Sequence, residues 1–286
     1  MRNTILTLII LLLSSMLPAQ EIDVYLIGGQ SNATGQGYLR NIPKSFITDT
    51  NVQIYYSKFM NGGGKKEHWQ PLCQASESKD RFGVELSMGT CLQQLYPKQR
   101  IAIIKHASSG TNLYKHWNPG NRHNEEQGTE FKIWIETVKT GIEALRAKGY
   151  IPVIRAMVWQ QGEADASFDA GLTNSKNYGK NLKNLIMYVR EILNAPNMLF
   201  VYGEVMPLET ERLTQRHLIR QAQIDVSEIA KTPLSVKNAI LVEADDLQMR
   251  RSDYHTPRPN DEVHLGTYGI LTLGERFAKA IHNLYH

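Results

Sequence analysis

The sequence predicts an α/β protein built on an open parallel β-sheet that is covered by helices on both faces. Short apolar runs alternate with segments of helical periodicity along the chain. The run at 101–104 is continuously apolar, as a strand buried on both faces should be. Clusters of polar residues directly follow several of these runs. No internal repeat or linker interrupts the alternation, so we expect residues 20–286 to form a single domain.

The first half of the chain supplies three of the expected strands and one helix. Residues 22–27 are rich in β-branched and aromatic side chains and end at a pair of glycines, and 52–58 has a similar composition. Leucines at helical spacing predict a helix over 84–96, which Pro97 ends. The apolar run at 101–104 then predicts the next buried strand.

The second half repeats this alternation to the last residues. Each helix carries an apolar stripe at a period of 3.6 residues, and each strand is a short apolar run. The expected elements, in chain order, are a helix at 129–148, a strand at 153–159, a helix at 172–193, a strand at 198–205, a helix at 212–230, a strand at 239–242 and a helix at 267–284.

Residues 1–19 have the layout of a secretory signal peptide. Arg2 is their only charge, the run at 5–13 is apolar, and small residues precede a cleavage point after Ala19 or Gln20. The apolar run is short for a membrane span, and an uncleaved anchor or a core helix are the alternatives. We therefore expect an exported protein, periplasmic or released, with no membrane span after processing.

Composition and cysteine usage exclude several functional classes. The formal net charge is +4, from 32 basic and 28 acidic residues, which is too small and too scattered for nucleic-acid binding. Phosphate-loop, dinucleotide-binding and zinc-site spacings are absent from the sequence, so we expect no cofactor and no metal. Cys73 and Cys91 form a disulfide or remain buried thiols, and both readings stay open.

Four polar clusters follow strands or precede the last helix, and the carboxyl ends of parallel strands are where such sheets bind ligands. The clusters span residues 28–35, 106–111, 159–165 and 261–266. In the first cluster, Gly28, Gly29 and Gln30 precede Ser31, which is typical of a nucleophile on a tight turn. The alternative is a plain strand-to-helix turn with Ser31 or Asn32 as its cap. In the last, Asp261 is three residues from His264, close enough to orient it as a general base.

The other two clusters supply candidate donors for an oxyanion. The amides of Ser31 and Gly110 and the side chain of Gln161 follow strands predicted to be neighbours. The alternatives are that Gly110 is an ordinary turn glycine and that Gln161 belongs to an ordinary polar loop. Glu163 is a second carboxylate in the same region and either orients His264 in place of Asp261 or holds its loop together.

Together these motifs resemble the SGNH/GDSL hydrolase superfamily, and more narrowly its sialate O-acetylesterase and carbohydrate esterase family 6 branch, which includes acetyl xylan esterases. The motifs are Gly-Gln-Ser-Asn at 29–32, Ser-Gly-Thr at 109–111, Trp-Gln-Gln-Gly-Glu-Ala-Asp at 159–165 and Asp-x-x-His at 261–264. The resemblance implies a three-layer α/β/α sandwich of flavodoxin-like type with a five-stranded parallel sheet.

The resemblance also implies a set of roles. Ser31 would be the nucleophile, His264 the base and Asp261 its orienting acid, with Glu163 as the alternative acid that some members have been argued to use. The Ser31 and Gly110 amides and the Gln161 side chain would form the oxyanion hole. Contacts to the substrate are expected from Gln30, Asn32, Ser109, Gln160 and Trp117. Gln160, Ser109 and Val84 depart from the family pattern, and none of these departures removes a proposed catalytic group.

The predicted function is removal of acetyl groups from acetylated oligo- or polysaccharides, xylan or a related glycan, through an acyl-serine intermediate. An O-acetyl sialic acid is the alternative substrate. A lipid or aryl esterase on the same scaffold would need an apolar lining, and the loops at 60–80 and 112–128 are polar instead. A non-catalytic glycan-binding protein would not need Ser31, Asp261 and His264 together.

Overall fold

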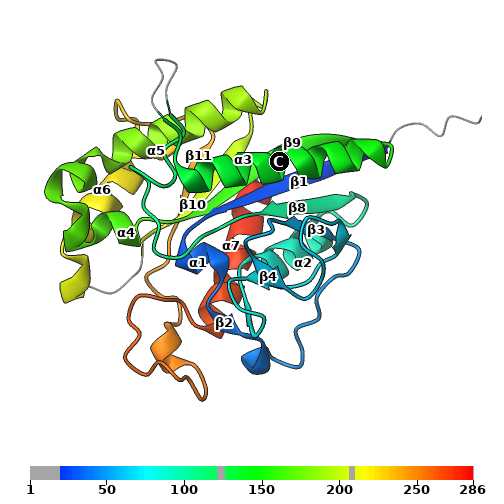
Figure 1. The fold of residues 1–286 in the computed structure, drawn as a ribbon, viewed down its shortest axis with the longest axis horizontal. Coiled ribbons are helices and arrows are strands. Elements are labelled where there is room, and N and C mark those ends of the chain that lie inside the picture. Colours follow the sequence, from blue (N-terminus) through cyan, green and yellow to red (C-terminus); the bar gives the residue numbers. More distant parts are fainter. Residues whose placement is uncertain (1–19, 121–125, 206–209, 286) are drawn as a thin grey trace, which may run out of the picture.

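A central β-sheet runs through the molecule between two layers of helices in this computed structural model (Figure 1). The structure describes residues 20–120, 126–205 and 210–285. The expected signal peptide lies outside these residues. The sheet has seven strands in the order β11-β10-β9-β1-β8-β3-β5. Their bounds are β1 Gln20–Gly29, β3 Gln53–Tyr56, β5 Gln70–Pro71, β8 Ile101–Lys105, β9 Tyr150–Gln160, β10 Leu199–Gly203 and β11 Ala239–Val242.

The predicted fold class is confirmed, and the sheet is larger than the five strands expected. The five strands from β11 to β8 are all parallel and form the expected core. Strand β3 pairs with β8 in parallel and β5 pairs with β3 antiparallel, which extends the sheet at one edge. Short two-residue pairs, β2 Gly37–Tyr38 with β7 Arg81–Phe82 and β4 Asn61–Gly62 with β6 Ala75–Ser76, form two further small sheets beside it.

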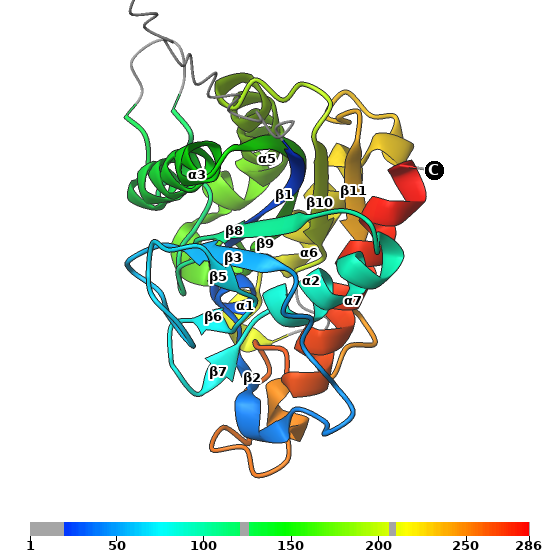
Figure 2. The ribbon, with the colours of Figure 1, turned by 90° about the vertical axis from the view of Figure 1, so that its right-hand side faces the viewer.

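The helices cover both faces of the sheet, as Figure 2 shows. One face carries α2 and α7, which pack against each other, and the other carries α3, α5 and α6. Two shorter helices, α1 and α4, follow β1 and β9 at the carboxyl edge. The bounds are α1 Ser31–Thr34, α2 Glu85–Leu95, α3 Thr129–Ala147, α4 Glu163–Ala166, α5 Leu172–Ile192, α6 Arg216–Val226 and α7 Thr267–Tyr285.

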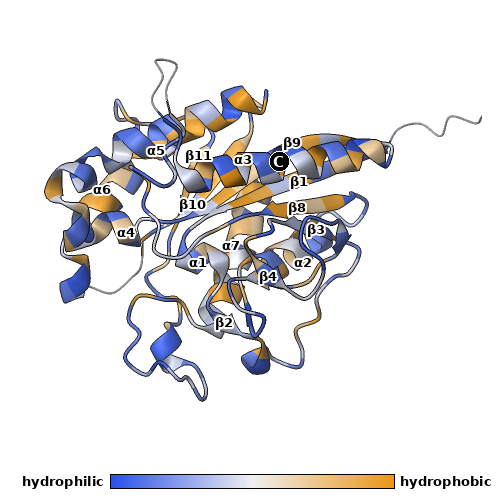
Figure 3. Cartoon of the chain, viewed as in Figure 1, coloured by the Kyte–Doolittle hydropathy of each residue, from blue (hydrophilic) through white to orange (hydrophobic). Residues whose placement is uncertain are grey.

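The core lies between the sheet and these helices. The strands β1, β8 and β10 are almost wholly buried, and large rings such as Trp134 and Tyr178 fill the layers beside them. Figure 3 shows the matching hydropathy, with apolar residues along the central strands and hydrophilic outer faces on α3 and α5. Helix α6 is shorter than expected because 3-10 turns at Glu211–Leu213 and Glu228–Ala230 replace its ends.

Both cysteines are free thiols, so the disulfide alternative is not what the structure contains. Burial raises the pKa of the Cys73 thiol to about 11 and also raises the pKa of Cys91. The thiolate form that would react is therefore disfavoured at both positions. Within the described ranges, no helix is long and apolar enough to span a membrane.

Candidate active site

Ser31 lies at a sharp turn between β1 and α1. The turn needs glycine at position 29, where φ is +135° and an added Cβ would lie 2.2 Å from the carbonyl oxygen of Gln160. The Gln30 amide donates to that same carbonyl at 3.0 Å, which fastens the turn to β9. Ser31 is then the first residue of α1, where backbone N–H groups have no acceptor within the helix. Its N–H is thus available to a ligand.

His264 and Asp261 lie together on the loop that precedes α7. Nδ1 of His264 is 2.9 Å from each carboxylate oxygen of Asp261. The backbone amides of Val263 and His264 both donate to Asp261 Oδ1 at 3.1 Å. Burial opposes ionisation of Asp261, but the hydrogen bond and charge of His264 and these two amides outweigh it and lower its pKa. The arrangement holds a carboxylate against one ring nitrogen and leaves Nε2 for other contacts.

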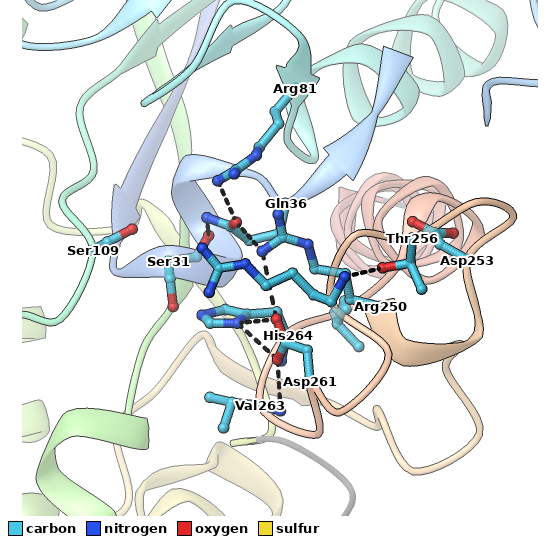
Figure 4. Close-up of polar contacts among 12 residues, drawn as sticks. Ser31, Gln36, Arg81, Ser109, Arg250, Asp253, Thr256, Asp261, Val263 and His264 are labelled. Carbon is cyan, nitrogen blue, oxygen red and sulfur yellow. Dashed lines mark hydrogen bonds and ion pairs between the residues drawn. The ribbon is translucent and has the colours of Figure 1, made fainter. Parts of the chain in front are cut away.

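A cavity of about 400 Å³ brings residues from all four polar clusters together. Ser31 and His264 both line it, and Figure 4 shows them close together with no hydrogen bond drawn between them. Four of the sequence-predicted residues line it as well: Gln30, Ser109, Gly110 and Glu163. Apo active sites often hold the nucleophile and base slightly apart, and the contact tightens when substrate binds.

Glu163 lies in the cavity wall without a hydrogen bond to His264. Its Oε1 accepts from Asn32 Nδ2 at 2.6 Å, and its buried Oε2 has no hydrogen-bond partner among the described residues. Burial raises the pKa of Glu163, although the Asn32 hydrogen bond and the charge of His264 act in the opposite direction. Of the two candidate acids, Asp261 is the one in contact with the imidazole.

Asn32 does not face the cavity and is not placed to contact a substrate. The side chain is 1% exposed and spans the gap between the Ser31 turn and the His264 loop. Its Nδ2 donates to the Val263 carbonyl at 3.2 Å, and its Oδ1 accepts from the Leu265 amide at 2.9 Å. Asn32 therefore binds the backbone on both sides of His264, a role that the sequence did not reveal.

Gln161 is turned away from the cavity, which contradicts its expected place in the oxyanion hole. The side chain is fully buried, and Nε2 donates to Gln30 Oε1 at 3.1 Å, to the Thr111 carbonyl at 3.2 Å and to Asp165 Oδ2 at 2.5 Å. These acceptors already use both of its protons. Gly110, by contrast, is exposed in the cavity wall with φ at +74°.

Two further expected substrate contacts are core residues. Trp117 is fully buried, its ring packs edge-on against Trp159 with centroids 5.0 Å apart, and its indole N–H donates to Thr111 Oγ1 at 2.8 Å. Gln160 is 2% exposed and donates from Nε2 to the Glu204 carbonyl at 3.0 Å, away from the cavity. Both predictions are wrong: Gln160, at the end of β9, points toward Glu204, and Trp117, in the loop after β8, packs into the core.

The cavity also has residues that sequence reasoning missed. They come from loops without a recognisable motif, so only the fold brings them to Ser31. Those with polar or charged side chains are Asn112, Tyr114, Ser167, Asp169 and Arg212. The described ranges contain no group of three His, Cys, Asp or Glu side chains that could hold a metal ion.

A second serine–histidine–carboxylate arrangement lies elsewhere in the core. Ser57 Oγ is 2.7 Å from Nδ1 of His106, whose Nε2 is 2.9 Å from Glu130 Oε2. Ser57 and His106 are each 1% exposed, and the Ser57 amide donates to the Lys105 carbonyl at 3.1 Å. Both side chains are therefore buried, and neither lines the cavity that holds Ser31.

Comparisons with known proteins identify the family of this chain. The sequence model of the family described as carbohydrate esterase, sialic acid-specific acetylesterase matches residues 21–283, which confirms the resemblance found in the motifs. No curated protein sequence matches the chain.

Several solved structures share the fold. A protein from Arabidopsis thaliana superposes with a TM-score of 0.67 at 18% identity, over 93% of this chain and 100% of that one. NanS superposes with a TM-score of 0.66 at 12% identity, over 93% and 98%. A carbohydrate acetylesterase from Xanthomonas citri reaches 0.56 at 16% identity, over 90% of this chain and 55% of that one. At these low sequence identities, the likeness shows a shared fold and nothing more.

Proposed function

Since this chain belongs to the family of sialic acid-specific acetylesterase carbohydrate esterases, we propose that it hydrolyses O-acetyl esters of glycans with Ser31 as its nucleophile. The observation that carries the proposal is the shared cavity of Ser31 and His264, in which Asp261 holds Nδ1 of the imidazole at 2.9 Å. A serine hydroxyl attacks an ester only when a base removes its proton, and this cavity supplies that base.

The proposed mechanism proceeds through an acyl-serine. His264 takes the Ser31 proton on Nε2 as Oγ attacks the acetyl carbonyl carbon, and Asp261 stabilises the imidazolium through Nδ1–H. The backbone N–H groups of Ser31 and Gly110 donate to the resulting oxyanion. The imidazolium then protonates the departing sugar alkoxide, and a water molecule deprotonated by His264 removes the acetyl group as acetate.

Replacement of Ser31 by alanine tests the nucleophile. We expect Ser31→Ala to lower kcat for p-nitrophenyl acetate by about 10³-fold or more, with an unchanged Tm. Ser57→Ala is the matched control, because Ser57 also contacts a histidine but lies in the core. Near wild-type turnover in the Ser31 variant would rule out this mechanism.

The substrate is proposed to be an acetylated glycan such as xylan, because the cavity wall is rich in polar side chains. Arg212 in this wall favours an O-acetyl sialoside as the second candidate, because a guanidinium pairs well with a carboxylate. Acetate release from acetylated xylan, acetylated glucomannan and an O-acetyl sialoside distinguishes the two. A loss of rate in Arg212→Gln that is confined to the sialoside would support the second candidate.

We further propose that residues 20–286 act as a single exported domain after removal of the signal peptide. The composition of residues 1–19 supports export. Expression of the full-length chain, followed by N-terminal sequencing of the exported product, tests this. A product that begins at residue 20 or 21 is expected, and a chain that retains Met1 would contradict it.

A further inference from the structure

A buried arginine connects the two halves of the candidate active site. Arg250 opens the 3-10 turn Arg250–Ser252 on the loop before α7 and is 2% exposed. Its Nη1 donates to Gln36 Oε1 at 2.8 Å and is 3.4 Å from Asp261 Oδ2. Its backbone amide also donates to the His264 carbonyl at 2.8 Å. Arg250 thus contacts both members of the Asp261–His264 pair.

Gln36 extends this connection to the nucleophile. Its Nε2 donates to Glu77 Oε1 at 2.9 Å and, over longer distances, to the Ser31 carbonyl at 3.4 Å and to Thr34 Oγ1 at 3.3 Å. Ser31 and Thr34 are the first and last residues of α1. Its Oε1 accepts from Arg81 as well as from Arg250, as Figure 4 shows. A continuous set of hydrogen bonds therefore runs from the backbone of Ser31 through Gln36 and Arg250 to Asp261.

The charge of Arg250 is only partly neutralised by its neighbours. The contact with Asp261 is long for an ion pair, Nε donates to the neutral Tyr38 hydroxyl at 2.9 Å, and the buried Nη2 has no hydrogen-bond partner in the described part of the chain. The guanidinium is nevertheless held in place by Gln36, Tyr38 and Asp261.

We propose that Arg250 is a positioning residue for the proposed hydrolysis, one that fixes Asp261 and His264 relative to Ser31. The inference rests on the proposed function, because the role has meaning only if His264 is the base. Arg250 itself does not line the cavity that holds Ser31, so it acts through Asp261 and not on the substrate.

Other charged and titratable groups face this region, and the test must hold them constant. Asp253 and Asp261 face Arg250 from its own loop, Tyr38 faces it from β2, and Arg81 of β7 shares Gln36 with it. Glu163 of α4 acts on His264 by its charge. None of these residues is changed in the variants below.

Three variants test whether the hydrogen bonds of Arg250, or only its charge, affect activity. Arg250→Met removes the donors and the charge, and Arg250→Lys keeps the charge but loses the planar fork. The adjacent Arg251 is the matched control: it pairs with Glu262 at 2.6 Å on a half-exposed surface, so Arg251→Met makes the same change of net charge outside the site. For each variant, kcat and KM for p-nitrophenyl acetate and the Tm are measured.

We expect Arg250→Met to lower kcat about 10- to 100-fold with KM within about twofold of wild type. Arg250→Lys should recover part of kcat with KM unchanged, because it keeps the charge but not the planar fork. Arg251→Met should match the wild type.

The contrary outcomes are distinct. An active wild type whose Arg250→Met variant keeps its kcat, or raises KM as much as it lowers kcat, overturns the role of Arg250 alone. A wild type that neither hydrolyses the ester nor takes up a fluorophosphonate at Ser31 overturns the proposed function and this role with it. If Arg250→Met does not fold, Arg250→Lys decides: a lower kcat with an unchanged KM supports the role, and a wild-type kcat overturns it.

Discussion

At the scale of single residues, two carboxylates compete for one chemical role. Asp261 contacts both the imidazole and two backbone amides, whereas Glu163 contacts only Asn32. Their pKa values move apart, lowered for Asp261 and raised by burial for Glu163. An orienting acid must stay ionised while the imidazolium forms, and Asp261 meets that requirement.

Comparison of Asp261→Asn with Glu163→Gln tests this assignment. We expect Asp261→Asn to lower kcat by about 10³- to 10⁴-fold, because an amide neither fixes the tautomer nor stabilises the imidazolium. Glu163→Gln should stay within about tenfold of wild type, because the new amide oxygen still accepts from Asn32. Steady-state kinetics on folded proteins decide, and a collapse of kcat in the Glu163 variant alone would transfer the role to Glu163.

Asn32→Ala tests the backbone clamp around His264. The change leaves the Val263 carbonyl and the Leu265 amide without partners in a buried setting, where each unsatisfied group costs about 1–3 kcal/mol. We expect a clear drop in Tm and a loss of kcat of about tenfold or more. Asn41→Ala is the control, since that side chain makes one exposed hydrogen bond to the Tyr254 carbonyl. A kcat equal to that of the control would show that the clamp does not affect catalysis.

Residue roles were the hardest feature to predict from sequence. Ser31, Asp261 and His264 were recognisable because each has a local pattern, two glycines before a serine or a carboxylate three residues from a histidine. Gln161 was assigned to the cavity from its place after a strand, but its amide satisfies the buried acceptors Gln30 and Asp165. Such partners come from other segments, and no local pattern indicates them.

At the scale of elements, the turn from β1 into α1 determines where Ser31 lies. Strand β1 pairs with β8 on one side and β9 on the other, so its carboxyl end lies at the centre of the sheet. Gly29 is paired with Gln160 and leaves no room for a side chain. The short helix that follows therefore starts close to β9.

Gly29→Ala should disrupt this turn. The added Cβ meets the backbone of Gln160 and the Cβ of Ala33, and φ at +135° is unfavourable for alanine. A single unfavourable backbone conformation costs about 1–3 kcal/mol, and the steric clash adds to that cost. We therefore expect the free energy of unfolding to fall by about 3 kcal/mol or more, or the variant to fail to fold. Gly149→Ala is the control: φ there is +84° but nothing lies within 4 Å, so a cost of about 1–2 kcal/mol is expected. Equal costs in urea unfolding would contradict the steric argument.

The elements themselves were largely predictable. The strand at Ala239–Val242 and the helices that begin at Thr129, Leu172 and Thr267 begin at the expected residues, because apolar period and glycine or proline stops fix them locally. Strand β5 was missed: it is two residues long, and its pairing with β3 is decided by a neighbour rather than by its own composition.

At the scale of the whole molecule, the site is assembled from segments more than 200 residues apart. Asn32 reaches Val263 and Leu265, and Gln36 reaches Arg250, so the segment that follows the first strand and the loop before the last helix are joined at the carboxyl edge of the sheet. The sequence predicted that the four clusters would meet, because the carboxyl ends of parallel strands share one edge. The hydrogen bonds between them could not be predicted, because they depend on the path of the loop between β11 and α7.

Burial of Asp165 should make the free energy of unfolding depend on pH. This carboxyl lies beneath Gln161, and burial raises its pKa from 3.8 to about 7. The unfolded chain loses this proton at lower pH than the folded protein does. The contribution of Asp165 to the free energy of unfolding therefore falls as the pH rises from about 4 to 7, and it is constant above about pH 7. At 1.36 kcal/mol per unit, the full loss is about 4 kcal/mol.

Asp165→Asn imitates the protonated form and should remove this dependence. We expect the Tm of wild type minus that of Asp165→Asn to decrease steadily between pH 4 and pH 7, and then to level off. Asp169→Asn, a change at an exposed carboxylate four residues further on, should leave the wild-type dependence in place. Parallel Tm curves for wild type and Asp165→Asn would show that Asp165 is ionised in the folded protein throughout this range, and that the hydrogen bonds from Gln161 and Leu113 outweigh its burial.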